Sequence, residues 1–224
     1  LVDDMDAGPD AARILLPVFE ADGAWDRVRD LVRAGIEEDA SVEQQIVQLS
    51  RLAEIEEERL GDPRAAFASL SEAYQLSEGA EEIGLEVERL GLQLEAYSEL
   101  AEIWTELAPL LDSREAETRL KVAQLCELHL NDPDRAIQEY REVLELQPGD
   151  IQAYGALEQL LGRAGRFHEL VDLLEQRVGA SEDDAQQRGL LLRLAQLFED
   201  ALDDVESSLS AWLRLLEVDA GNED

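Results

Sequence analysis

The chain repeats itself along its length, and this repetition constrains its fold more than any other feature. The stretch from Arg51 to Pro63, RLAEIEEERLGDP, returns from Lys121 to Pro133 as KVAQLCELHLNDP and from Arg193 to Val205 as RLAQLFEDALDDV. The steps are therefore 70 residues (from 51 to 121) and 72 residues (from 121 to 193). A fixed period of this size indicates an array in which each unit buries its apolar face only by stacking on its neighbour.

The segments between the turns have the pattern of amphipathic helices. Gly-, Pro- and Asp-containing turns recur at short, regular intervals, as at Gly61-Asp62-Pro63 and Gly162–Gly165. Between them apolar residues recur at spacings of three and four, as in Ile137, Tyr140 and Leu144, which places them on one helix face. No segment alternates with period two over the length of a strand, so the sequence predicts an all-α fold.

Several predicted helix starts have a capping residue. Asp62 and Asp132 each precede a proline, and Asp204 precedes Val205. A carboxylate at this position accepts hydrogen bonds from the free N–H groups of the first turn, and proline fits the first helical position because its missing N–H costs little there. Pro17, by contrast, lies inside an apolar run, so we expect the first helix to be kinked or split there.

The pattern predicts twelve helices in six hairpins. The hairpins alternate in kind, since the second helix opens on an aromatic residue in one kind and on Pro or Val in the other. We call the first, third and fifth hairpins odd and the others even. Their predicted ranges are 10–38, 43–77, 81–111, 115–147, 151–178 and 185–218.

The hairpins resemble the tetratricopeptide repeat (TPR) family. That family has a helix–turn–helix unit of 34 residues with Ala-x3-aromatic and a later Pro, a pattern that Ala136, Tyr140 and Pro148 fit best. Ser208-x3-Trp212 departs from it at the small residue. The resemblance covers nearly the whole chain in degenerate form. It implies a right-handed α-solenoid whose first helices line a concave groove for peptides or partner helices.

Charge is the extreme feature of the composition. Fifty-three acids face 19 bases, a formal net charge of −34, while 45% of the residues are hydrophobic. The periodic apolar residues favour a folded chain with solvated acidic faces. Phosphates would be repelled, so we expect no binding to nucleic acid. No apolar run is long enough to insert into a membrane. The compartment is unknown, with the cytoplasm preferred, and because Leu1 is not a start methionine we expect a fragment of a longer repeat protein.

The sequence offers no catalytic, metal or cofactor motif, and we expect neither an enzyme nor a cofactor. His129 and His168 lie in different hairpins without metal-ligand spacing. Cys126 is the single cysteine, which excludes an internal disulfide, and we expect it to pack as a small apolar residue.

Two functions remain. The first is a non-catalytic protein–protein interaction scaffold that binds a peptide or partner helix in the concave groove. The second is an acidic decoy or chaperone-like surface that binds basic proteins through convex negative charge. For the scaffold function, we predict that a row of cations on the groove-facing helices binds acidic side chains or a C-terminal carboxylate of the partner. The alternative is that these cations form salt bridges with neighbouring acids of the same chain. The row consists of Arg51, Lys121, Arg193, Arg89, Arg59 and Arg163.

The C-terminal hairpin is expected to lack a following neighbour. Leu209, Trp212, Leu213 or Leu216 should then be partly uncovered, since terminal repeats normally need a polar cap. We therefore expect possible self-association through this end.

Overall fold

The computed structural model describes residues 9–36, 41–181 and 183–220, and these residues contain helices and turns but no strand. The α-helices are α1 (Pro9–Ala21), α2 (Trp25–Ala34), α3 (Val42–Glu54), α4 (Pro63–Leu76), α5 (Glu81–Gln93), α6 (Tyr97–Leu107), α7 (Glu115–Leu128), α8 (Pro133–Leu146), α9 (Ile151–Arg163), α10 (Phe167–Ala180), α11 (Asp184–Asp200) and α12 (Val205–Ala220). The predicted all-α class, built of TPR-like helical hairpins, is confirmed.

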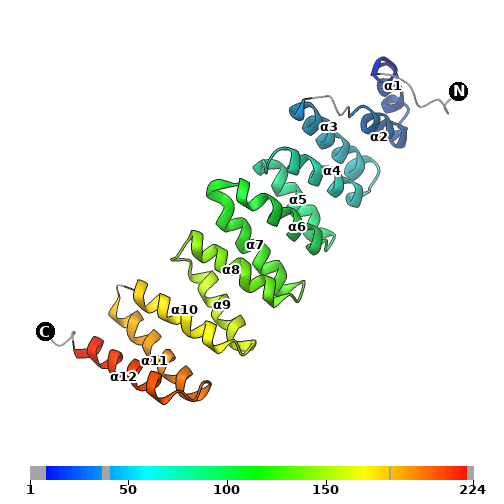
Figure 1. Ribbon diagram of the computed structural model, residues 1–224. Helices are drawn as coiled ribbons and strands as arrows, with labels where there is room; N and C mark the ends of the chain where they lie inside the picture. The colour runs from blue at the N-terminus through cyan, green and yellow to red at the C-terminus, as the bar shows by residue number, and fades with distance from the viewer. Residues whose placement is uncertain (1–8, 37–40, 182, 221–224) are drawn as a thin grey trace. The chain divides into compact units, whose positions relative to one another are not determined.

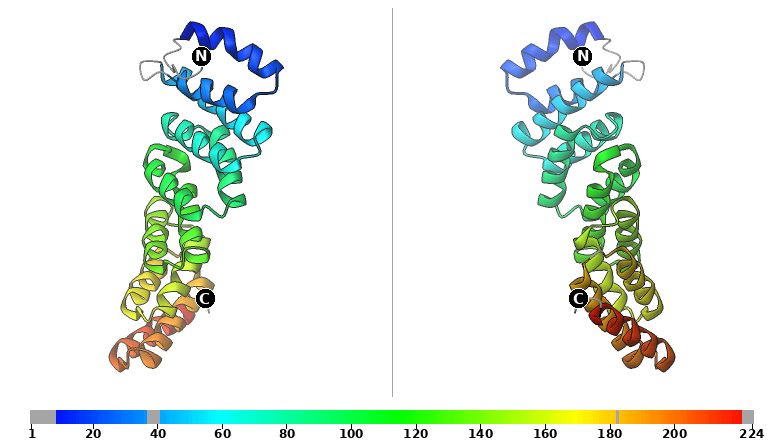
Figure 2. Two further views of the ribbon diagram at one scale, coloured as in Figure 1. Left: turned by 90° about the vertical axis from the view of Figure 1, so that its right-hand side faces the viewer. Right: turned by 90° about the vertical axis from the view of Figure 1, so that its left-hand side faces the viewer.

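The chain forms two compact units, Leu1–Asp132 and Pro133–Asp224. Unit 1 contains α1–α7 and unit 2 contains α8–α12 (Figure 1). In unit 1 the first hairpin, dark blue in both views of Figure 2, is followed by the second hairpin in lighter blue and cyan. Within each unit the second helix of one hairpin packs on the first helix of the next, as α4 packs on α5 and α8 on α9. That the whole chain is one solenoid and part of a longer array stays a prediction.

The turns of the even hairpins share one geometry. The residue before the capping Asp lies in the left-handed region at Gly61, Asn131 and Asp203, with φ of 65°, 50° and 52°. In each turn the N–H of the following Asp donates a hydrogen bond to the carbonyl six residues earlier, at 2.7, 3.0 and 2.9 Å in chain order. Glycine or asparagine suits this conformation best, which explains why the turn recurs in the sequence.

The capping predictions are confirmed where hydrogen bonds define them. The Asp62 carboxylate accepts from the Ala65 N–H at 3.0 Å, and Asp204 accepts from the Ser207 N–H at 3.0 Å. Hydrogen bonding to the Ser207 side chain and then to its N–H lowers the pKa of the Asp204 carboxyl. The sequence-visible turn residues therefore act as predicted, by satisfying free N–H groups of the following helix.

The odd hairpins use a second turn. Gly23, Glu95 and Gly165 have φ of 67°, 53° and 68°. The next residue then donates its N–H to the carbonyl five residues earlier, at 2.8, 2.8 and 3.0 Å in the three turns. The two alternating kinds of hairpin thus correspond to two local geometries.

A few helix details differ from the predictions. Pro17 lies inside α1, which is continuous there, so the helix is not split; a kink at Pro17 stays a prediction. The first helix of the hairpin predicted at 43–77 is α3 followed by a π-helical turn, η1 (Ile55–Arg59), in which the N–H of Leu60 donates to the carbonyl of Ile55. The helix predicted to reach residue 111 ends at Leu107 and continues as two 3₁₀ turns, η2 (Ala108–Leu110) and η3 (Asp112–Arg114).

The core of each unit lies between neighbouring hairpins. A small residue is fully buried at one equivalent place in the second helix of every even hairpin: Ala66, Ala136 and Ser208. Ser208 fills the place of the family's alanine because its hydroxyl donates to the Glu199 carboxylate at 3.0 Å. Cys126 is buried, as predicted.

Candidate functional site

The predicted cation row lies on the first helices of the hairpins. Three of its members occupy one equivalent place, and each contacts a glutamate on the first helix of the preceding hairpin. The pairs are Arg51–Glu20 at 2.6 Å, Lys121–Glu88 at 2.9 Å and Arg193–Glu158 at 2.7 Å. These side chains therefore connect successive hairpins within a unit.

Arg89 extends the same pattern. Its guanidinium donates two hydrogen bonds to the Glu57 carboxylate at 2.9 and 2.7 Å, and its Nε donates to Glu86 at 2.8 Å. The hydrogen bonds to Glu57 and then to Glu86 raise the pKa of Arg89. A two-point contact fixes both position and orientation, which a single lysine contact does not.

Lys121 lies in a more enclosed setting than the arginines. Its Nζ lies 5.6 Å from the centroid of the Trp104 ring and 3.5 Å from a Glu117 oxygen. Partial burial lowers its pKa, but the hydrogen bond to Glu88 and the charges of Glu88 and Glu117 outweigh this and raise the pKa overall. The ammonium therefore remains charged at neutral pH.

Arg59 and Arg163 make contacts of another kind. Arg59 lies over the Trp25 ring, 5.0 Å from its centroid, and Arg163 donates to the Gln159 side chain at 3.3 Å. Within each unit, the cations of the row therefore make separate contacts along the first-helix face. A ligand-binding role for these six side chains stays a prediction.

The acidic partners were not visible as partners in the sequence. Arg51, Lys121 and Arg193 are separated from their glutamates by 31, 33 and 35 residues, which is close to one hairpin length. A search for opposite charges about one hairpin apart would have included these glutamates among its candidates without singling them out.

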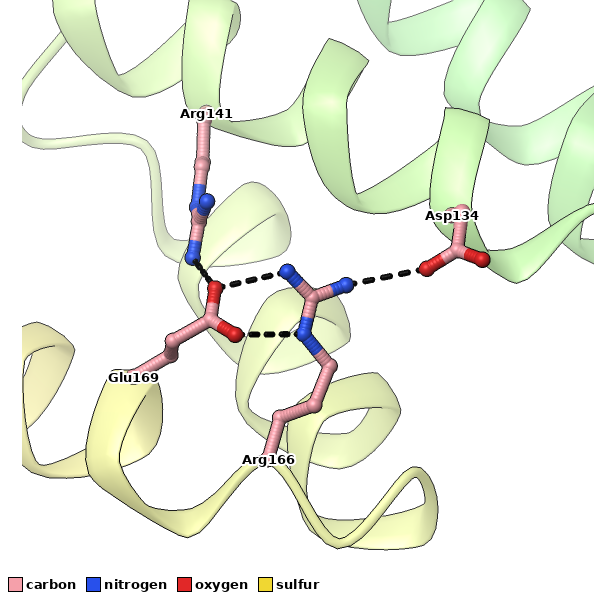
Figure 3. Close-up of polar contacts among 4 residues, drawn as sticks. All are labelled: Asp134, Arg141, Arg166 and Glu169. Carbon is pink, nitrogen blue, oxygen red and sulfur yellow. Dashed lines mark hydrogen bonds and ion pairs between the residues drawn. The ribbon is translucent and has the colours of Figure 1, made fainter.

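The second helices carry a parallel set of pairs between hairpins. They are Arg33–Glu72, Arg64–Glu99, Arg141–Glu169 and Arg214–Glu175. In Figure 3, Glu169 lies between Arg141 and Arg166, and Arg166 also contacts Asp134 at 2.9 Å. The hydrogen bonds from Arg166 and then from Arg141 lower the pKa of Glu169 to about 2.

Unit 1 has a groove of about 500 Å³ on its first-helix face, lined by α3, η1, α4 and α5. Ala53, Leu70 and Ile83 contribute apolar surface to it. Its remaining lining is Ser50, Glu54, Glu57, Glu58, Glu82, Glu86 and Arg89. Among the residues that the structure describes, Glu54, Glu58 and Glu82 have no ion-pair partner. The groove is therefore apolar at its base and negative at its rim.

No catalytic arrangement emerges from the two histidines. His129 stacks on Tyr97 with ring centroids 4.0 Å apart, and His168 is exposed at the start of α10. The described part of the chain contains no cluster of three or more potential metal ligands. None of the helices it contains combines the length and apolarity needed to cross a bilayer.

The outer face of α12 is apolar and exposed. Leu209, Leu213 and Leu216 lie four and three residues apart and are all exposed, and Trp212 is partly covered. Trp212 donates to Glu199 at 3.2 Å. The predicted exposure of this hairpin is thus observed.

Comparison with known proteins gave similarities in structure only. No family model and no curated protein matches the chain. Among solved structures, MamA is 16% identical over 78% of this chain and 92% of its own, with a TM-score of 0.43. YrrB, a TPR protein, is 14% identical over 85% and 93% with a TM-score of 0.43. A tetratricopeptide repeat protein from Parabacteroides merdae is 14% identical over 93% and 78% with a TM-score of 0.40.

Proposed function

We propose that this chain is a non-catalytic protein–protein interaction scaffold that binds a peptide or partner helix along the first-helix face of its hairpins. The observation that carries the proposal is the groove of unit 1, which has an apolar base between two first helices, with Ile83 partly exposed. An amphipathic helix laid into such a groove buries its apolar residues and keeps its polar face in water.

The charges around this groove favour a basic partner. Arg89, the cation in the lining of this groove, is paired with Glu57 of the preceding hairpin. Glu54, Glu58 and Glu82 have no ion-pair partner among the described residues. Lysine or arginine side chains flanking the apolar stripe of a bound helix would pair with these three carboxylates. The remaining acidic surface, with a net charge of −34 over the chain, would speed the encounter.

A second candidate function is an acidic decoy or chaperone-like surface that holds basic proteins by charge alone. The net charge itself favours it. The two functions differ in what they require of a ligand, because a groove needs apolar residues in a helical arrangement and a decoy needs only positive charge.

The test uses two labelled peptides of identical composition. In one, leucines and lysines alternate with helical periodicity, so that they form separate faces; in the other, the same residues are scrambled. We expect the amphipathic peptide to bind more tightly, and its affinity to survive moderate salt because part of it is apolar. Equal binding of both peptides, with a steep loss in salt, would establish the decoy instead.

A variant locates the site. Replacing Glu54, Glu58 and Glu82 together by Gln removes three charges from the groove rim without adding volume. Replacing three exposed glutamates of unit 1 outside the groove, Glu78, Glu95 and Glu102, changes the net charge equally and serves as the matched control. Only the first variant should weaken the amphipathic peptide, and an equal effect of both would exclude this groove as the site.

A further inference from the structure

Unit 2 has a cavity of about 640 Å³ that is lined by α8, α9 and α10. Its apolar lining consists of Leu144, Pro148, Tyr154, Leu157, Leu161 and Leu173. The α9 residues among them are buried, whereas Leu144 is partly exposed and Pro148 is exposed. Part of this apolar surface is therefore open to solvent, in a space of the size that proteins use to hold a ligand.

In unit 1 the chain fills the equivalent place with its own residues. A step of 70 residues takes Leu144 of the cavity to Tyr74. Leu111, which follows α6, is buried, and its Cδ2 would lie 2.2 Å from a Cβ added to Gly79. The Tyr74 hydroxyl would lie 3.7 Å from the same Cβ, so both side chains lie over this turn. Arg114 then donates a hydrogen bond to the Gly79 carbonyl at 2.7 Å. We call Leu111 and Arg114 the plug.

A proline explains why the chain turns back at this point in unit 1. The residue before a proline disfavours the helical conformation, and α6 ends at Leu107, two residues before Pro109. The 3₁₀ turns η2 and η3 follow at once and contain or flank both plug residues. The plug therefore depends on a local break in the second helix of the third hairpin.

Unit 2 has no such plug. Gly179 stands where Pro109 stands in unit 1, and α10 continues to Ala180. The residues at 181–186 that follow it, SEDDAQ, include neither a leucine nor an arginine. The cavity of unit 2 thus lies at the place that an apolar and a basic side chain close in unit 1.

The rim of the cavity is negative. Glu145 on α8 and Asp172 on α10 are exposed and have no ion-pair partner among the described residues. Arg141 and Glu169, which also line the cavity, are paired with each other (Figure 3). The charge that remains uncompensated is therefore that of the two carboxylates, and a cation attached to an apolar group complements this surface.

We infer that this cavity is a second binding site, made of different residues from the groove of unit 1, and that it binds a segment of a partner protein in which an arginine follows a leucine by three residues. The leucine buries against Leu144 and Pro148, and the arginine pairs with Glu145 or Asp172. The partner segment thus takes the place that the plug takes in unit 1. Because the two sites share no residue, this inference does not rest on the proposed function.

Fluorescence anisotropy of a labelled peptide, titrated with the full chain, tests the inference. The probe copies residues 107–115 with Asn for Asp112 and Gln for Glu115, which removes both acids and leaves LAPLLNSRQ, blocked at its ends. We expect binding, and we expect serine in place of Leu111 to weaken it by at least about tenfold, since a buried leucine side chain contributes that much. No binding of the probe at millimolar concentration overturns the inference.

Two altered probes test the spacing. Leu110 is 56% exposed in unit 1, so serine in its place is the matched control and should leave binding nearly unchanged. Glutamine in place of Arg114 should weaken binding in low salt and have less effect in high salt, where the rim charges are screened. Equal losses from serine at either leucine would contradict the assigned spacing.

Charge variants of the chain locate the site. Glu145→Gln with Asp172→Asn removes the two rim charges. Asp200→Asn with Glu206→Gln, at exposed acids elsewhere in unit 2, changes the net charge equally and serves as the control. Only the first double variant should weaken binding of the probe. An equal effect of both would show that the probe responds to overall charge, and the inference would fail.

A blocking variant tests the cavity itself. Ala180 lines the cavity at the end of α10, so Ala180→Trp should fill part of it and abolish binding. Ala164→Trp, at an exposed alanine in the turn before α10, is the control and should bind the probe like the unaltered chain. Undiminished binding by Ala180→Trp, with the helical circular dichroism signal intact, overturns the inference.

The groove variant of unit 1 separates this site from the proposed function. Replacing Glu54, Glu58 and Glu82 by Gln should leave binding of the probe unchanged, although it should weaken the basic amphipathic peptide. If that variant weakens the probe and the rim variant of unit 2 does not, the probe occupies the groove of unit 1. The inference then fails while the proposed function stands.

Discussion

The strongest test of the junction geometry is a single methyl group added at two glycines. Gly84 and Gly155 each lie near the start of the first helix of an odd hairpin, α5 and α9. An added Cβ at Gly155 meets nothing within 4 Å, while one at Gly84 lies 2.8 Å from Cε2 and 3.1 Å from Oη of the buried Tyr74. The same substitution should therefore have opposite effects at the two positions.

The magnitudes follow from two opposing effects. Replacing glycine by alanine inside a helix stabilises by about 1 kcal/mol, since the unfolded chain loses less conformational freedom. Overpacking a tight site costs about 1–3 kcal/mol, and Tyr74 has little room to move because it is buried. We expect Gly155→Ala to stabilise by about 1 kcal/mol and Gly84→Ala to destabilise by roughly the same amount once the clash is included.

Urea unfolding followed by far-UV circular dichroism measures both effects as shifts of the midpoint. The contact between residue 84 and the Tyr74 ring is isolated by repeating Gly84→Ala in a Tyr74→Leu background. Because the ring is then absent, Gly84→Ala should become stabilising. The difference between the two backgrounds is the coupling between these positions. Stabilisation by Gly84→Ala in the unaltered chain, equal to that at Gly155, would refute the account of α4 packing on α5.

Three further predictions concern charge and capping. Arg51→Glu combined with Lys121→Glu should lower the stability of unit 1 by about 1 kcal/mol, the scale of such pairs, without weakening the binding of the basic amphipathic peptide. An acidic peptide that binds only the unaltered chain would show instead that these cations bind a ligand. Because the pKa of Glu169 is lowered to about 2, its ion pairs should stabilise the folded state fully above about pH 4.5, and this stabilisation should be lost as the pH falls towards 2. The urea midpoint of the Glu169→Gln variant should lack this contribution to the pH dependence, so identical pH profiles of the variant and the unaltered chain would count against it. Asp204→Ala should destabilise α12 by about 1 kcal/mol, seen as faster amide exchange there, whereas unchanged exchange would mean that the Ser207 N–H needs no cap.

The sequence by itself determined the local structure of this protein. The 70- and 72-residue steps, the three-and-four spacing of apolar residues and the turn residues sufficed for the all-α class and for helix positions to within a few residues. These features are local, because a cap or a left-handed turn acts within one or two helical turns of the residue that forms it. The π-helical turn at η1 was missed, since a one-residue shift in hydrogen bonding leaves no pattern in the apolar spacing.

Only the tertiary structure decided what the charged side chains do. The sequence placed Arg51, Lys121 and Arg89 on one helix face but left open whether they bind a ligand or neighbouring acids. Their partners lie about one hairpin away, and which glutamate among 53 acids comes within reach depends on how one hairpin is stacked on the next. The same stacking decides that Gly84 faces a tyrosine ring while Gly155 faces open space. Contacts between hairpins depend on distances of a few tenths of an ångström, and sequence periodicity does not contain that information.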